Sequence, residues 1–229
     1  MSKAALIVGA GSGLSAALAR QLAQRGYRCI LAARNVGKLA ALCGETGAEG
    51  IECDVSAEGA VAHLFAQTDA RGATPSVVVY NPSARVRGPL VDLDPAAVAH
   101  AIAVTAFGGF LVAQEATRRM LKAGSGTIVF TGASASVKGY PQSATFAMGK
   151  FALRGLAQSM ARELAPQGIH VAHVVIDGGI RSADRINPPD KPDSLLDPEA
   201  VAQSYLHLID QPRNAWSWEI EVRPWVERF

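Results

Sequence analysis

The chain has 229 residues, of which 49% are hydrophobic and 18% are charged. That is enough apolar material for a large core and too little charge for a disordered chain, so we expect one folded domain over residues 1–229. The net charge of +2 comes from scattered basic residues, which argues against a nucleic-acid-binding protein.

Seven short apolar runs are predicted to be strands, because they do not alternate with polar residues and are bounded by Gly or Pro. They are residues 4–9, 28–33, 50–53, 76–80, 126–130, 169–176 and 218–224. Helical patterns lie between them, at residues 13–25, 36–43, 57–71, 95–122, 142–165 and 198–210. This alternation predicts an α/β fold class: a doubly wound parallel sheet (Rossmann fold) of about seven strands with helices on both faces.

Two of the helices carry clear start signals. Asp94 and Asp197 each stand directly before a proline, which is the pattern of an N-cap aspartate with proline at the first helical position. The segment between residues 177 and 198 is rich in Pro and Asp and is long for a connection. We therefore expect it to be either a lid or a disordered loop.

The three cysteines, Cys29, Cys43 and Cys53, have no CxxC spacing, so neither a disulfide framework nor a zinc site is expected. The N-terminal apolar run breaks at Gly9 and is typical of a first strand rather than a signal peptide. No run approaches the ~20 apolar residues of a membrane span. These features predict a cytoplasmic protein with no membrane partner and no metal.

The first strand is followed by a glycine-rich turn and then a helix, the order in which a glycine motif is meaningful. Gly9 would allow the sharp turn, and Gly13 would let the backbone approach a pyrophosphate. The helix from Leu14 would direct its free N–H groups and positive dipole end at that anion. We therefore predict that Gly9, Ser12, Gly13 and Leu14 bind a dinucleotide.

The residue after the second strand bears on which dinucleotide is bound. An acidic residue there would hold the ribose hydroxyls of NAD, but this chain has Ala33 followed by Arg34. An arginine can pair with the 2′-phosphate of NADP through charge-assisted contacts. NADP (NADPH) is therefore favoured over NAD, although a solvent-facing Arg34 remains the alternative.

The loop Gly9-x-x-x-Gly13-x-Ser15 resembles the TGxxxGxG motif of the short-chain dehydrogenase/reductase superfamily, with Val8 and Ser15 in place of its first and last residues. The segments 53–56, 78–84 and 165–182 resemble further motifs of that family in the same order. The resemblance implies additional cofactor contacts. They would be made by Asp54, Val55, Asn81, Lys150, Ile180 and Ser182.

The same resemblance implies a Tyr-x-x-x-Lys pair as the proton-transfer site, together with a serine upstream and an asparagine on the fourth helix. Aligned on Lys150, the tyrosine position is Phe146, the serine position is Ala133 and the asparagine position is Thr105. The chain therefore resembles an atypical member that lacks the catalytic tyrosine.

Two nearby hydroxyls could substitute for the missing groups. Ser134 is adjacent to the serine position, and Tyr140 follows a glycine on the loop before the fifth helix. For Tyr140, a loop aromatic that covers the core is at least as good an interpretation. His170 and His173 lie in or near the sixth strand and are expected to be structural rather than catalytic.

Two functions remain open at this point. The first is an NAD(P)-dependent oxidoreductase, favouring NADP(H), that reduces a carbonyl or enoyl group of a small-molecule substrate with an altered proton donor. The second is a catalytically inactive NADP(H)-binding sensor or assembly subunit. The resemblance also implies a homodimer or homotetramer, formed through the fourth and fifth helices and the last strand.

Overall fold

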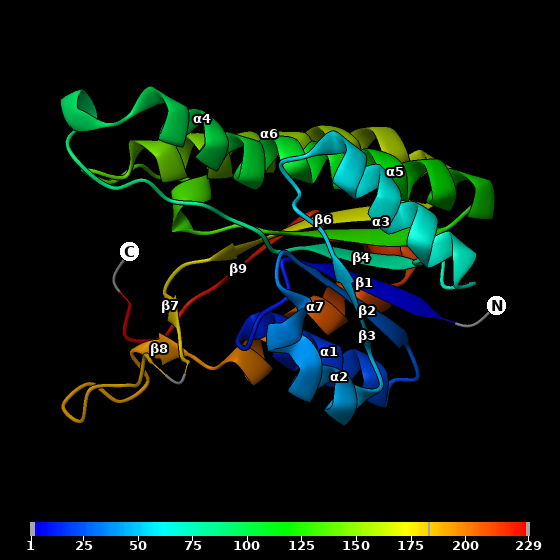
Figure 1. Cartoon of the computed structure of the whole chain (residues 1–229). Helices are drawn as coiled ribbons and strands as arrows, with labels where there is room; N and C mark the ends of the chain where they lie inside the picture. The colour runs from blue at the N-terminus through cyan, green and yellow to red at the C-terminus, as the bar shows by residue number, and fades with distance from the viewer. Residues whose placement is uncertain (1–2, 183, 228–229) are drawn as a thin grey trace.

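Seven parallel strands form the central sheet of a computed structural model that describes residues 3–182 and 184–227 (Figure 1). Their order across the sheet is β3-β2-β1-β4-β5-β6-β9. The strands are β1 (Ala4–Val8), β2 (Arg28–Ala33), β3 (Glu49–Glu52), β4 (Val77–Tyr80), β5 (Gly126–Thr131), β6 (Ile169–Ile176) and β9 (Glu219–Val222). The order reverses between β1 and β4, so the predicted doubly wound parallel sheet is confirmed.

Helices cover both faces of this sheet (Figure 1). One face carries α1 (Leu14–Gln24), α2 (Ala40–Thr46) and α7 (Pro198–Asp210), and the other carries α3 (Glu58–Ala70), α4 (Pro95–Ile102), α5 (Gly108–Ala123) and α6 (Ala144–Leu164). Short 3₁₀ turns are η1 (Val36–Leu39), η2 (Leu90–Asp92), η4 (Ser134–Ser136), η5 (Ala165–Gln167) and η6 (Arg213–Ala215). Successive side chains of the inner strands enter opposite cores, which explains why these strands are mostly apolar, whereas the edge strands β3 and β9 carry glutamates.

The two predicted N-caps are confirmed. Asp94 accepts hydrogen bonds from the backbone N–H groups of Ala96 and Ala97, and Asp197 accepts one from Glu199. Each carboxylate satisfies donors that the first turn of a helix leaves unpaired.

The predicted continuous helix over residues 95–122 is wrong in one respect. Between α4 and α5 the chain forms a π-helical turn, η3 (Ala103–Phe107). Thr105 lies in this turn, is buried, and accepts a hydrogen bond from the Ala84 N–H at 3.0 Å. Through Thr105 the π-turn is hydrogen-bonded to the loop that follows β4. Turns of this kind are frequent at functional sites.

Contrary to the expectation from sequence, the run Pro95–Ala123 is long and apolar enough to pass as a membrane span by length and composition. Buried helices of globular proteins pass the same criterion. In the fold this run is α4, η3 and α5, which pack beside α3 and α6 over one face of the sheet (Figure 1).

The segment between residues 177 and 198 was expected to be a lid or a disordered loop, and its described part folds back on itself beyond the end of β6. β7 (Gly179–Ile180) pairs in parallel with β8 (Leu195–Leu196). The Leu195 N–H donates to the Asn187 side chain at 2.9 Å, and Arg181 forms an ion pair with Asp197 at 3.0 Å. The segment therefore forms a folded wall at the carboxyl end of the sheet.

Candidate active site

Three adjoining cavities follow the carboxyl ends of the strands. The loop cavity, of about 640 Å³, lies between the turn after β1 and the ends of β2 and β3. The central cavity, of about 230 Å³, shares Asn81 and Ser83 with it. The outer cavity, of about 500 Å³, shares Ala133, Phe146 and other lining residues with the central one. Ligands of open α/β sheets bind in this position, where the strand order reverses.

The turn after β1 requires glycine at its first position. Gly9 has φ of +77°, and a Cβ there would lie 2.7 Å from the backbone nitrogen of Pro82. Ser15 donates to the Gly9 carbonyl at 3.2 Å, and the Asn81 amide donates to the Ser15 hydroxyl at 2.8 Å. These bonds fix the turn against the end of β4. At Gly13 no side chain caps α1, so N–H groups of its first turn are available to an anion.

The far wall of the loop cavity is basic. Arg34 and Lys38 both line this wall. Ala33, the last residue of β2, also lines the cavity and carries no charge. Asp54 lies on the adjacent wall and accepts hydrogen bonds from the Ser56 hydroxyl at 2.7 Å and the Ser56 N–H at 3.0 Å. These bonds hold the pKa of Asp54 below its usual value. The cavity therefore offers hydrogen-bond acceptors at one wall and positive charge at another.

Lys150 lies in the wall of the central cavity with only 2% of its surface exposed. Its Nζ donates to the Thr131 carbonyl at 2.6 Å. Burial, and secondarily the positive charge of Arg85, lowers its pKa to about 7. A buried ammonium is costly because the low-dielectric interior disfavours the charged form. Lys150 can consequently hold or release a proton near neutral pH.

Phe146 lies one helical turn before Lys150, on the same side of α6. Its ring centroid is 5.9 Å from the Lys150 Nζ and 3.8 Å from the guanidinium carbon of Arg85. Both cations are within the distance at which an aromatic ring attracts positive charge. The ring therefore forms an apolar, cation-flanked wall between the central and outer cavities, and it carries no exchangeable proton.

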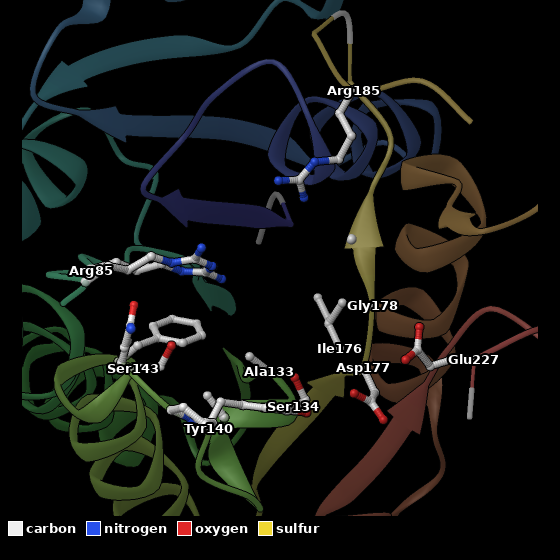
Figure 2. A pocket seen from close by; sticks show the side chains of 16 residues that line it. Arg85, Ala133, Ser134, Tyr140, Ser143, Ile176, Asp177, Gly178, Arg185 and Glu227 are labelled. Carbon is white, nitrogen blue, oxygen red and sulfur yellow. The ribbon is translucent and has the colours of Figure 1, made fainter. Parts of the chain in front are cut away.

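Ser134 and Tyr140 line the outer cavity (Figure 2). Lys150 instead lines the central cavity. Ser134 begins the 3₁₀ turn after β5, and the Tyr140 side chain is exposed. Neither hydroxyl is hydrogen-bonded to Lys150 among the residues the structure describes. Their assignment as substitutes for the tyrosine and serine of the family motif stays a prediction.

A buried polar chain behind the site was not found from the sequence. His173 Nδ1 lies 2.9 Å from Glu219, and its Nε2 lies 3.3 Å from the Ser136 hydroxyl, which accepts from the Ala133 N–H. Arg154 forms a bidentate pair with Glu219 at 2.6 and 2.7 Å. His173 is fully buried, and burial lowers its pKa to about 4.

This chain has the residue types of a Ser–His–Glu triad, but it has no opening to substrate. Ser136 and His173 are both 0% exposed. The neutral histidine instead holds the 3₁₀ turn that carries Ala133 and Ser134, the structural role expected for it. His170 is also buried, stacks on Trp216 at 4.8 Å and bonds the Ser217 carbonyl at 2.9 Å.

Most of the residues predicted to bind a cofactor lie along the loop and central cavities. Those that line them are Gly9, Ser12, Arg34, Asp54, Val55, Asn81, Lys150 and Ile180. Leu14 is buried beneath the first turn of α1. Ser182 does not line the described cavities, and its backbone pairs with that of Arg185.

Comparisons with known proteins agree with this geometry. The family model described as short chain dehydrogenase matches residues 3–186. An uncharacterised oxidoreductase of Staphylococcus aureus is 26% identical over 228 residues, covering 97% of each chain. A short-chain dehydrogenase structure from Rhodopseudomonas palustris is 35% identical, covers 98% of this chain and 100% of its own, and has a TM-score of 0.85. A metagenomic short-chain oxidoreductase in complex with NADP is 28% identical, covers 97% of both chains and has a TM-score of 0.84.

Proposed function

Because this chain belongs to the short-chain dehydrogenase family, we propose that it is an NADPH-dependent reductase of a small carbonyl compound in which Lys150 supplies the proton. One observation carries the proposal: a buried lysine of lowered pKa faces a cavity that adjoins the glycine-rich loop. The NADP complex of the metagenomic relative supports the choice of cofactor class.

The residues of the loop cavity fit NADPH. Gly9 permits the sharp turn against Pro82, and a Cβ at Gly11 or Gly13 would meet no protein atom within 4 Å, so the loop leaves open space for close approach of a pyrophosphate. Arg34 and Lys38 place positive charge where the 2′-phosphate would lie, and Asp54 offers acceptors to the adenine amine. When bound, NADPH supplies the hydride for reduction.

The protein's own part in the reaction is to position the substrate and to manage a proton. Lys150 holds that proton on Nζ, oriented by the Thr131 carbonyl. As negative charge develops on the substrate oxygen, the ammonium stabilises it and transfers the proton, leaving a neutral amine. A pKa near 7 makes Lys150 a stronger acid than an ordinary lysine, and a general acid is most efficient when its pKa lies near the operating pH.

A substitution at Arg34 tests the cofactor preference. Arg34→Ala should weaken NADPH binding by about 10- to 100-fold, because a charge-assisted contact to the 2′-phosphate is worth roughly 1.5–3 kcal/mol. NADH binding should be unchanged. Both constants come from titrating the quenching of protein fluorescence, with the exposed Arg162→Ala on α6 as control. An equal loss of affinity for both nucleotides would contradict a 2′-phosphate contact.

Restoring the tyrosine should do little by itself. Phe146→Tyr should change kcat/KM for carbonyl reduction by less than about 10-fold, a small part of what a positioned general acid contributes. Ala133 still provides no hydroxyl for the substrate oxygen, and Arg85 covers the ring. The matched control is Phe151→Tyr, an exposed position on the same helix. A gain of several hundred-fold would show that only the tyrosine is missing.

A second candidate function is an NADPH-binding protein without turnover. Phe146 and Ala133, which provide no hydroxyls where the family motif places them, favour it. Titration with NADPH followed by a panel of ketones, aldehydes and enoyl compounds separates the two. Tight binding with oxidation no faster than in buffer supports the binding protein, and absence of binding contradicts both functions.

We also propose a homodimer or homotetramer built through α4, α5 and α6. Large apolar side chains on this layer are exposed, namely Phe107, Phe110, Leu121, Met148 and Phe151. Apolar surface of this kind is typical of protein–protein contacts. Sedimentation velocity at micromolar concentration measures the state directly, and a monomer would contradict the proposal.

A further inference from the structure

We propose that the substrate carries an anionic group, a carboxylate or a phosphate, which binds between Arg85 and Arg185 where the central and outer cavities meet. The inference rests on the proposed function, because it concerns the substrate of the same site. It begins from a cluster of three arginines to which the proposed function assigns no ligand.

Arg85 and Arg185 both line the central and the outer cavity, and Arg87 lines the outer one. Arg85 comes from the loop after β4, and Arg185 comes from the folded segment after β7. Their side chains extend from different walls toward the same open space (Figure 2). A group bound there would be contacted from two sides.

These guanidinium groups have no acidic partner within residues 3–182 and 184–227. Among the described residues, no carboxylate forms an ion pair or a side-chain hydrogen bond with Arg85, Arg87 or Arg185. Burial, then the charges of Arg87 and Arg185, lowers the pKa of Arg85. Like charges brought together without a counter-ion repel one another, and a bound anion would relieve that repulsion.

Arg85 and Arg185 are exposed, but each side chain lies against one neighbouring group. Arg85 lies over the Phe146 ring at 3.8 Å. Arg185 lies along Gly179, where an added Cβ would come within 3.0 Å of its Nη1. A guanidinium that is already positioned loses less side-chain freedom when it binds a carboxylate or phosphate in a bidentate fashion.

The acidic residues of the outer cavity do not neutralise this cluster. Asp177 is bound to Lys138 at 3.2 Å and to Arg223 at 3.4 Å. Glu227 lies on the opposite side of the cavity from Arg85 (Figure 2). The charge at the junction of the two cavities is therefore positive.

The position of the cluster matches a substrate group rather than a cofactor phosphate. The loop cavity has its own cations, Arg34 and Lys38, and Arg85 does not line it. Phe146 and Ile176 form apolar surface on the same shared wall. A substrate with an anionic end, an apolar body and a carbonyl directed at Lys150 would use each of these features.

Binding of three matched probes tests the inference. They are 4-oxo-4-phenylbutanoate, its uncharged methyl ester, and phenacyl phosphate, titrated calorimetrically into the protein with and without saturating NADP⁺. At least one anion should bind about 10-fold or more tightly than the ester, as expected for charge-assisted hydrogen bonds. The anion that binds more tightly identifies the group as a carboxylate or a phosphate.

Variants locate the site. Arg85→Gln and Arg185→Gln should each remove most of the preference for the anion and leave ester binding unchanged, whereas Arg162→Gln, exposed on α6, should remove none. Unfolding temperatures check that each variant is folded. The inference would be overturned if the acid and the ester bound equally, or if neither anion bound at millimolar concentration. It would also be overturned if neither substitution changed the preference for the anion over the ester.

Two further outcomes separate the inference from the function on which it rests. If Arg85→Gln or Arg185→Gln weakens NADPH as much as it weakens the anion, the arginines belong to the cofactor site and the inference is wrong. If NADPH fails to bind, the proposed function is wrong, and the titrations without cofactor still decide whether the arginines select an anion.

Discussion

Lys150→Met should slow carbonyl reduction by about 10²- to 10⁴-fold, the usual cost of losing a general acid. Methionine fills similar space but can neither stabilise the developing charge nor give up a proton. Single-turnover oxidation of bound NADPH measures the effect on the chemical step. The control is Lys122→Met, at an exposed position near the end of α5. A loss smaller than 10-fold would mean that another group donates the proton.

The same substitution should make the protein more stable at pH 7. Burial lowers the Lys150 pKa from 10.5 to about 7, so between those values the unfolded chain binds a proton that the folded chain does not. The stability of the wild type therefore rises with pH across this window. Lys150→Met should raise the free energy of unfolding by about 1–3 kcal/mol at pH 7, because it removes a buried charge.

Urea unfolding at pH 7 and at pH 10.5 measures this difference. The gain should nearly vanish at the higher pH, where the lysine is neutral when folded and half neutral when unfolded. Lys122→Met should change stability little at either pH. A loss of stability in Lys150→Met at pH 7 would show that the bond to the Thr131 carbonyl outweighs the cost of burying the charge.

Gly9→Ala should abolish NADPH binding and lower the free energy of unfolding by about 2–5 kcal/mol. The φ of +77° is strained for alanine, at roughly 1–2 kcal/mol. The new Cβ would also lie 2.7 Å from the Pro82 nitrogen, and overpacking of this kind costs about 1–3 kcal/mol. Nucleotide titration and urea unfolding measure the two effects.

The control for this change is Gly11→Ala in the same loop. Gly11 lines the loop cavity, an added Cβ there meets no atom within 4 Å, and its φ is not positive. Its stability should therefore stay close to that of the wild type, while NADPH binding falls because the Cβ occupies the pyrophosphate side of the turn. Unchanged stability in Gly9→Ala would contradict the geometry of the turn after β1.

The sheet could be predicted from sequence because its strands are buried on both faces. Runs such as residues 4–9 stay apolar for their full length, and the structure forms β1 over Ala4–Val8. The aspartate caps before α4 and α7 depend only on neighbouring residues. Features determined locally were thus predictable.

Features determined by distant contacts were not. The π-turn at Thr105 depends on the Ala84 N–H, and the orientation of the buried His173 ring depends on Glu219 in the last strand. The β7–β8 pair joins residues on either side of a polar, proline-rich segment. No local pattern in the sequence reports such partners.

The site was predictable to a similar extent. The glycine-rich loop and Lys150 were marked by spacing, and the structure places them along adjoining cavities. The lowered pKa of Lys150 and the stacking of Arg85 on Phe146 arise from burial and from a loop distant in sequence. The arginine cluster was missed for the same reason, since Arg85 and Arg185 lie a hundred residues apart.

The most direct test of NADPH-dependent reduction is a stopped-flow measurement of wild-type protein saturated with NADPH and mixed with the anionic ketone that binds most tightly. Absorbance at 340 nm follows the nucleotide, and Lys150→Met serves as the reference. We expect a single-turnover decay in the wild type that is about 100-fold or more slower in the variant. The reductase function would be contradicted if NADPH bound tightly but its absorbance decayed no faster than in buffer. That result would have to hold for this ketone and for the wider carbonyl and enoyl panel.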